Sequence, residues 1–112
     1  LTNSYFAGAA KTPAATDLAK WYAENKKTQD LFTSTGADAA KMIVMALTSN
    51  PTQDVDKMIR NLEGKSWVGV KGPMKIDASS HMLIQPMFLV ALEKSGTRYV
   101  PKLLKTITNV GK

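Results

Sequence analysis

The stretch "LFTSTGADAAKMIVMALTSN", residues 31–50, decides the fold class of this sequence. It starts with a short mixed segment (30–33) that reads as a brief strand or extended loop, passes through Gly36, and continues into a helix. Apolar side chains fall on nearly every side of that helix, whereas an outer helix of a soluble protein has one apolar stripe. We therefore expect the helix to lie between layers, against a sheet that the 112 residues do not encode.

The start of this helix is predicted from Thr35-Gly36-Ala37-Asp38, which resembles a capping signature with Asp in place of the usual Glu. Thr35 would be the cap, and Asp38 would complement the positive end of the helix dipole. That role accounts for an acid at position 38 without a ligand, although a ligand contact there stays open.

Upstream, residues 1–6 read as the end of a strand that turns at Ala7-Gly8. An amphipathic helix follows, with Thr12 as its N-cap and Pro13 at its first position, where a missing N–H costs nothing. Lys26-Lys27 closes this helix next to its carbonyl end, where positive charge is favourable.

Downstream, a third helix is predicted to start at Asn50-Pro51-Thr52-Gln53 and to end at Gly64. Its apolar residues form a single stripe, so its other face is solvated. The chain then favours strands, with short segments around residues 67–70 and 74–77 and a turn at 78–80.

The last quarter of the sequence predicts two strands around a turn at residues 94–97. Pro86 and Pro101 each remove a donor from a strand ladder. Those strands are therefore edges, or the chain changes direction at the prolines.

The composition excludes several kinds of site. The 112 residues have no cysteine, which removes disulfides, thiol catalysis and thiolate metal sites, and the lone His81 cannot build a histidine cluster. No nucleophile, base and acid form a catalytic pattern. Gly64, Gly69 and Gly72 precede a strand and not a helix, so they do not form a phosphate loop. We expect a protein that is not an enzyme and needs no cofactor.

The net charge of +6 raises nucleic acid as a partner. Apart from Arg60 and Arg98, however, the 15 basic residues are scattered lysines. Base readout favours clustered arginine with interleaved aromatic residues. Scattered lysine is more typical of a solvated face.

Four segments together resemble a known family: "TNSYFAGA", "TSTGADAAKMIVMAL", "GVKGPMKIDASSHMLIQPMF" and "YVPKLLKTI". Their order and spacing are similar to the C-terminal part of the type I periplasmic binding proteins that serve branched-chain amino-acid ABC importers. The matching positions are Gly36–Ala40, Gly72–Asp77, His81 and Gln85–Met87. The resemblance covers almost the whole sequence but only about the last third of such a receptor.

The resemblance implies an α/β fold of two lobes, with three helices followed by a few strands that end in a hairpin. Residues 1–87 would belong mostly to one lobe, with hinge crossings near 1–5 and 85–87, and residues 88–112 would return to the other lobe. The implied hinge residues are Ser4, Tyr5, Gln85, Pro86 and Met87.

The resemblance also implies a substrate-binding subunit that captures an amino acid or a related amide or aromatic acid between its lobes. The subunit would deliver this ligand to a membrane permease, in the periplasm or outside the cell, either free or anchored through a leader outside this sequence. Ligand contacts would come from Phe32, Thr33, Thr35 and Tyr5. Each residue has a structural alternative: Phe32 as core, Thr35 as a cap, and Tyr5 as packing at the hinge.

Two other functions stay open at this point. One is a small stand-alone basic α+β domain that binds a protein or nucleic acid. The other is the same receptor fold used as a sensor. If the helix after Gly36 lacks its cover, these residues would also expose an apolar face and associate as a homodimer.

Overall fold

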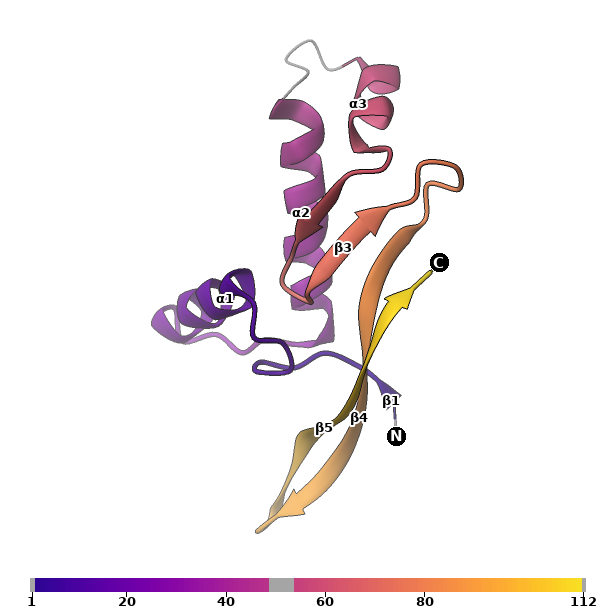
Figure 1. Ribbon diagram of the computed structural model, residues 1–112. Helices are drawn as coiled ribbons and strands as arrows, with labels where there is room; N and C mark the ends of the chain where they lie inside the picture. Colours follow the sequence, from indigo (N-terminus) through magenta and orange to yellow (C-terminus); the bar gives the residue numbers. More distant parts are fainter. Residues whose placement is uncertain (1, 49–53, 112) are drawn as a thin grey trace.

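The structure is a computed structural model that describes residues 2–48 and 54–111. Along the chain, one short strand precedes three helices, and four strands follow them (Figure 1). They are β1 (Thr2–Asn3), α1 (Pro13–Glu24), α2 (Leu31–Thr48), α3 (Val55–Leu62), β2 (Ser66–Val68), β3 (Pro73–Ile76), β4 (Leu83–Ser95) and β5 (Arg98–Val110). The predicted fold class, with three helices before a set of strands that ends in a hairpin, is confirmed.

The long strand β4 serves two sets of partners. At its start, Leu83 and Ile84 pair with Ile76 and Lys75 of β3, which in turn pairs with β2. From Gln85 onward, β4 pairs with β5, and near Leu89 it also pairs with β1. All of these pairings are antiparallel. Figure 1 shows the result: β4 runs from the helical end of the molecule into a hairpin that extends away from it.

Pro86 lies where β4 exchanges partners. The register of β4 against β5 shifts between Gln85 and Met87, on either side of this proline. At Pro86 the alternative of an edge strand is wrong, because β4 lies between its neighbours, whereas β5, which holds Pro101, pairs with β4 alone among the described strands. The alternative that the chain changes direction at Pro86 stays a prediction. The missing N–H of Pro86 costs little where the ladder is already interrupted.

The hairpin turn and the first cap agree with the sequence. Gly96 has φ +63 at the first position of the two-residue turn that joins Ser95 to Arg98, a position where positive φ suits glycine. The hydroxyl of Thr12 accepts the Ala15 N–H at 3.0 Å and caps α1. However, α1 ends at Glu24, before the predicted Lys26-Lys27, because Asn25 caps it and Lys26 turns to φ +52.

The predicted start of α2 is wrong. Residues 30–33 are not a strand, because the helix already begins at Leu31. The Asp30 carboxylate accepts the N–H groups of Phe32 (2.9 Å) and Thr33 (3.0 Å), and the Thr33 hydroxyl accepts the N–H of Asp30 (3.0 Å). This reciprocal pattern satisfies the free donors of a first turn. Thr35 therefore is not the cap.

Asp38 lies inside α2 and links it to the loop between β2 and β3. The residue is 4% exposed, and its carboxylate accepts the N–H groups of Val70 at 2.7 Å and Lys71 at 3.4 Å. Burial raises the pKa of Asp38, and the two backbone hydrogen bonds oppose that rise. The prediction that Asp38 serves the helix dipole is therefore replaced by a tertiary link.

For the third helix, the predicted start at Asn50–Gln53 lies outside the described residues. Within them, α3 begins at Val55, and the Asp54 carboxylate caps it by accepting the Lys57 N–H at 3.1 Å. Gly64 follows the helix with φ +69, which confirms its predicted end.

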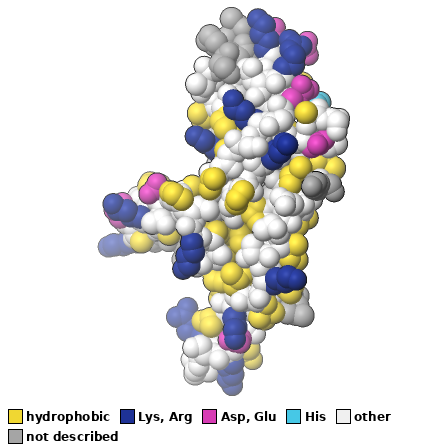
Figure 2. All heavy atoms as spheres, viewed as in Figure 1, with side chains coloured by type: hydrophobic (Ala, Val, Ile, Leu, Met, Phe, Trp, Pro, Cys, Tyr) yellow, Lys and Arg dark blue, Asp and Glu magenta, His cyan; other side chains and the backbone are white. Residues whose placement is uncertain are grey.

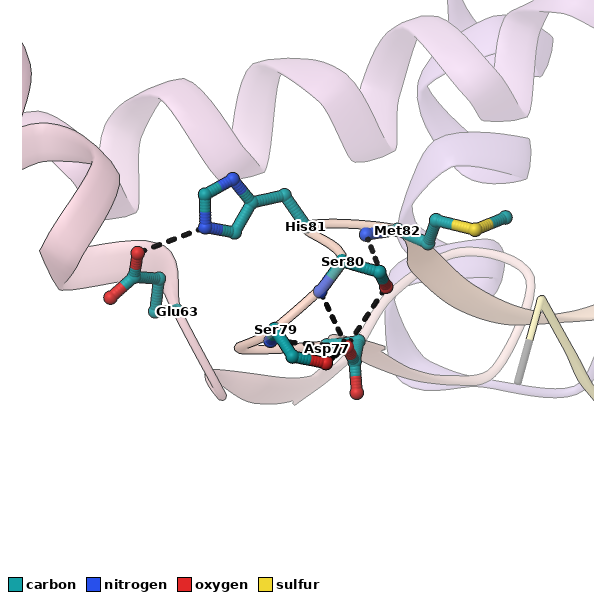
Figure 3. Close-up of polar contacts among 6 residues, drawn as sticks. All are labelled: Glu63, Asp77, Ser79, Ser80, His81 and Met82. Atoms are coloured by element: carbon teal, nitrogen blue, oxygen red, sulfur yellow. Dashed lines mark hydrogen bonds and ion pairs between the residues drawn. The ribbon is translucent and has the colours of Figure 1, made fainter.

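The loop between β3 and β4 is organised by one carboxylate (Figure 3). Asp77 Oδ2 accepts the hydroxyls of Ser79 (2.6 Å) and Ser80 (2.8 Å) and also their backbone N–H groups. These bonds, led by that from the Ser79 hydroxyl, hold the pKa of Asp77 far below its usual value of 3.8. His81 is exposed in this turn, and its Nε2 lies 2.9 Å from Glu63 Oε1.

The core lies where the N-terminal segment crosses β4. Its buried members come from the N-terminal segment and the start of α1, the loop before β3, and the middle of β4: Tyr5, Ala9, Ala15, Val70, Phe88 and Val90. The Tyr5 and Phe88 rings meet edge to face, with their centroids 5.8 Å apart. This cluster fixes the N-terminal segment against the middle of β4.

The apolar sides of α2 and α3 stay exposed. Ile43 is 57% exposed and Val55 66% exposed, beside an apolar groove of about 390 Å³ between the two helices. The radius of gyration is 16.0 Å, against about 13 Å for a compact domain of this length. Figure 2 shows hydrophobic side chains across the face where helices meet strands. The exposure agrees with the expectation that these residues do not themselves cover α2.

Gly69 offers a test of the link between α2 and the β2–β3 loop. A Cβ at Gly69 would overlap Asp38 Oδ1 and would lie 2.8 Å from Met74 Sδ. We expect Gly69→Ala to lower the free energy of unfolding by about 1–3 kcal/mol, because the packed loop must shift. Urea unfolding of the protein measures this change.

The matched control is Gly36→Ala in α2, where nothing lies within 4 Å of the added Cβ. That variant should raise the free energy of unfolding by about 0.5–1 kcal/mol, because alanine suits a helix better than glycine. Equal effects at both glycines would contradict the close approach of Asp38 to the loop.

The Asp77 loop predicts a specific pH dependence. A carboxyl whose pKa is lower in the folded state stabilises the fold fully above its unfolded pKa, and this stabilisation is lost as pH falls through the folded pKa. The ¹³C chemical shift of the Asp77 carboxyl group, measured by NMR, should still be that of the ionised form at pH 3.8, the usual pKa of the group. Half-protonation at pH 3.8 would contradict the hydrogen bonds described for its Oδ2.

Candidate functional site

A pocket of about 240 Å³ lies where β1, the first turn of α2, the β2–β3 loop and β4 meet. We call it the crossing pocket. It is lined by Asn3, Ser4, Tyr5, Leu31, Ser34, Thr35, Lys71, Gln85, Pro86, Met87 and Phe88.

Most of the site residues predicted from the sequence lie in this pocket. They include the whole implied hinge set, together with Thr35. Segments about eighty positions apart meet there because β1 is antiparallel to β4 and the Ser4 N–H donates to the Phe88 carbonyl at 3.1 Å. The two passages that the sequence predicts as crossings therefore run side by side.

Phe32 and Thr33 are not among the residues that line the pocket. Because α2 begins at Leu31, residues 31, 34 and 35 share one face of its first turns. Phe32 is 69% exposed, and the Thr33 hydroxyl is engaged with Asp30. Their proposed ligand contacts stay predictions without support from the pocket geometry.

Five residues of the pocket were not predicted from the sequence: Asn3, Leu31, Ser34, Lys71 and Phe88. Ser34 is completely buried, and its hydroxyl has no hydrogen-bond partner in the described part of the chain. The correct phase of α2, set by the Asp30 cap, would have placed Ser34 on the same face as Thr35. Lys71 was missed because nothing in its local sequence distinguishes it from the other lysines.

The electrostatics of the pocket centre on Lys71. Burial lowers the pKa of its ammonium, and the Asp38 carboxylate opposes that shift. Its Nζ donates to the Thr35 hydroxyl at 3.5 Å. Burial, and secondarily Asp38, raises the pKa of the Tyr5 phenol, which therefore stays protonated at neutral pH. The site thus has a cation and neutral hydroxyls.

The loop that holds Lys71 also packs on the partner exchange of β4. Gly72 has φ +136, and a Cβ there would lie 3.0 Å from Pro86 Cγ. Only glycine combines that backbone conformation with so close an approach. The position of the Lys71 side chain is therefore tied to the point where β4 changes partners.

Other kinds of site find little support in residues 2–48 and 54–111. They contain no group of three or more acidic or histidine side chains that could hold a metal ion. None of the helices described is both long and apolar enough for a membrane span. A larger hollow of about 550 Å³ lies between α1 and α2, but no unpartnered buried polar atom of the described residues lines it.

Comparison with known proteins gives the family. The model of the periplasmic binding protein family matches residues 1–97. A search of curated proteins finds no match to the sequence.

Solved structures share the fold. An ABC-type branched-chain amino acid transporter protein from Rhodopseudomonas palustris CGA009 superposes with a TM-score of 0.81 at 22% identity, over 94% of this chain and 29% of that one. A solute-binding protein from R. palustris HaA2, in complex with p-hydroxybenzoic acid, superposes with a TM-score of 0.76 at 19% identity, over 93% of this chain and 29% of that one. A leucine-, isoleucine-, valine-, threonine- and alanine-binding protein from Brucella ovis superposes with a TM-score of 0.74 at 15% identity, over 95% of this chain and 30% of that one.

The chain thus spans less than a third of the length of these structures, while nearly all of it superposes on them. At these identities the superpositions establish the fold, which is part of the type I binding-protein architecture. The family model covers most of the sequence. The chain belongs to the periplasmic binding protein family.

Proposed function

We propose that the protein containing this chain is the substrate-binding subunit of an ABC importer and captures a small carboxylic acid. Family membership supports a solute-binding role. Structures that share the fold are described as binding leucine and other amino acids, p-hydroxybenzoic acid or benzoate. The single observation that supports this function best is the crossing pocket, with its cation, neutral hydroxyls and apolar wall.

Within this proposal, Tyr5 and Thr35 contact the ligand. Both line the crossing pocket, and both present a hydroxyl group to a small polar solute. The phenol of Tyr5 stays neutral because its pKa is raised, so it can donate a hydrogen bond to a ligand oxygen. Leu31 and Met87 supply an apolar wall, as is usual in pockets for small molecules.

The hinge consists of Ser4 and Tyr5 in one passage and Gln85–Met87 in the other. The register shift and the missing N–H of Pro86 leave β4 with fewer ladder bonds there than along the rest of its length. Few cross-strand bonds allow a small change of backbone angles at low cost. Residues 1–87 would then belong mostly to one lobe and residues 88–112 to the other, and ligand would favour the closed population.

The partners follow from this role. The protein would deliver its ligand to a membrane permease and would work in the periplasm or outside the cell, free or membrane-anchored. A chain of only these residues would form homodimers through the exposed apolar groove of α2 and α3. The basic nucleic-acid-binding domain is the less favoured alternative, because the family match accounts for almost the whole chain.

The direct test measures binding by the full-length chain that contains these residues. Isothermal titration with leucine, alanine, benzoate and 4-hydroxybenzoate should show saturable binding of at least one acid with a stoichiometry of one. The matched control is a DNA duplex titrated at low salt, which should not bind. Salt-sensitive DNA binding together with no binding of any acid would overturn the proposed function.

A further inference from the structure

The backbone around Lys71 is fixed more firmly than its place in a loop suggests. Its own N–H and that of Val70 both donate to the Asp38 carboxylate, and the Gly69 N–H donates to the Gly72 carbonyl at 2.9 Å. The Lys71 side chain therefore projects from a turn whose backbone is held by hydrogen bonds. Its half-buried side chain lines the crossing pocket.

The charge of Lys71 is not neutralised by an ion pair. Among the described residues, ion pairs join Lys20 to Glu24, His81 to Glu63 and Lys102 to Glu93, and none includes Lys71. The acid that interacts with it, Asp38, directs its oxygens to backbone N–H groups. A half-buried cation of this kind is stabilised by an anion that enters from outside.

The neighbouring polar groups suit a carboxylate that carries a second polar substituent. Ser34 is completely buried and its hydroxyl has no partner among the described residues, and the Thr35 hydroxyl lies 3.5 Å from Lys71 Nζ. Both hydroxyls can donate to a carboxylate oxygen. On the β4 side, Gln85 Oε1 is buried, has no partner in residues 2–48 and 54–111, and can accept from an ammonium or hydroxyl group.

The volume fits a small ligand. About 240 Å³ equals the space of about eight water molecules at ~30 Å³ each. Pro86 and Met87 close the apolar side. A compact acid can thus place its carboxylate at Lys71 and its other polar group at Gln85.

We propose that Lys71 is the specificity-determining residue of the crossing pocket and binds the carboxylate of the ligand, with Ser34 and Thr35 as hydroxyl donors. This assignment rests on the proposed solute-binding function. It predicts that the pocket binds anionic acids with higher affinity than their neutral amides. Unlike hydroxyl groups alone, an ammonium distinguishes a charged carboxylate from an amide of nearly the same shape.

The test compares acids with their amides in the full-length chain. Leucine is paired with leucinamide, alanine with alaninamide, benzoate with benzamide, and 4-hydroxybenzoate with 4-hydroxybenzamide. For every acid that the wild type binds, Lys71→Met should weaken binding by about tenfold or more, because a charge-assisted hydrogen bond is lost. Binding of the amide should change less than twofold, and Lys71→Arg should recover most of the acid affinity.

The matched control is Lys75→Met, an exposed lysine on β3 that does not line the crossing pocket. It should leave the affinities for acid and amide unchanged. A second measurement needs no variant: NMR follows the pKa of the Lys71 ammonium in the wild-type protein. It should rise when a bound acid is added and should not rise with the amide.

The outcomes separate this inference from the proposed function. If the wild type binds no acid, both fail. If it binds an acid and Lys71→Met binds it equally well, or if acid and amide bind the wild type equally, the role of Lys71 is wrong and the function stands. Should Lys71→Met not fold, an unchanged pKa of Lys71 on binding of the acid would overturn the inference.

Discussion

The exchange of partners along β4 is the constraint on which the rest of the structure depends. A strand can form a ladder with only one neighbour on each edge, so a strand that serves two sets of partners must change over at some residue. On the edge of β4 opposite to β5, this happens between Ile84, which pairs with β3, and Leu89, which pairs with β1, and Pro86, which has no N–H to donate, lies in this interval. The N-terminal segment crosses the same region, and the main core packs there. A pocket between these passages is the geometric consequence.

A second interaction fixes the helices to that crossing. Asp38 is buried inside α2, and its bonds to the Val70 and Lys71 N–H groups, together with the charge of Lys71, offset the cost of burying a carboxylate. Through this link the start of α2, the β2–β3 loop and Pro86 keep fixed positions. The hairpin of β4 and β5 has no such link to the helices among the described residues, and it projects from them (Figure 1).

Local signals in the sequence were sufficient for several elements. Thr12-Pro13, Gly64 and Gly96 predicted a cap, a helix end and a turn because each acts within a few residues of itself. The start of α2 was wrong because Asp30 and Thr33 form a reciprocal cap one turn before the more familiar Thr35–Asp38 pattern. Asp38 was misread for a different reason. Its partners are 32 and 33 positions away, beyond any local pattern.

The candidate site shows the same division. The family resemblance brought Ser4, Tyr5 and Gln85–Met87 together, and all of them line one pocket. Phe32 and Thr33 fell outside it because they were predicted in an extended segment, whereas they lie in the first turn of α2 on a different face from Leu31 and Thr35. Lys71 could not be found from the sequence, since its partial burial and its lack of an ion pair with any described residue arise only in the folded chain.

The central claim is that the crossing is a hinge at which ligand binding moves the hairpin relative to the helices. The 112 residues contain no cysteine, so Lys57→Cys on α3 and Lys94→Cys near the hairpin tip are the two labelling sites within them. Any cysteine elsewhere in the full-length chain is replaced by serine before two spin labels are attached. Pulsed electron–electron double resonance spectroscopy of the full-length chain then gives the distribution of distances between the two spin labels. The account predicts a distribution that shifts and narrows when a bound acid saturates the protein. Identical distributions with and without that acid would contradict it.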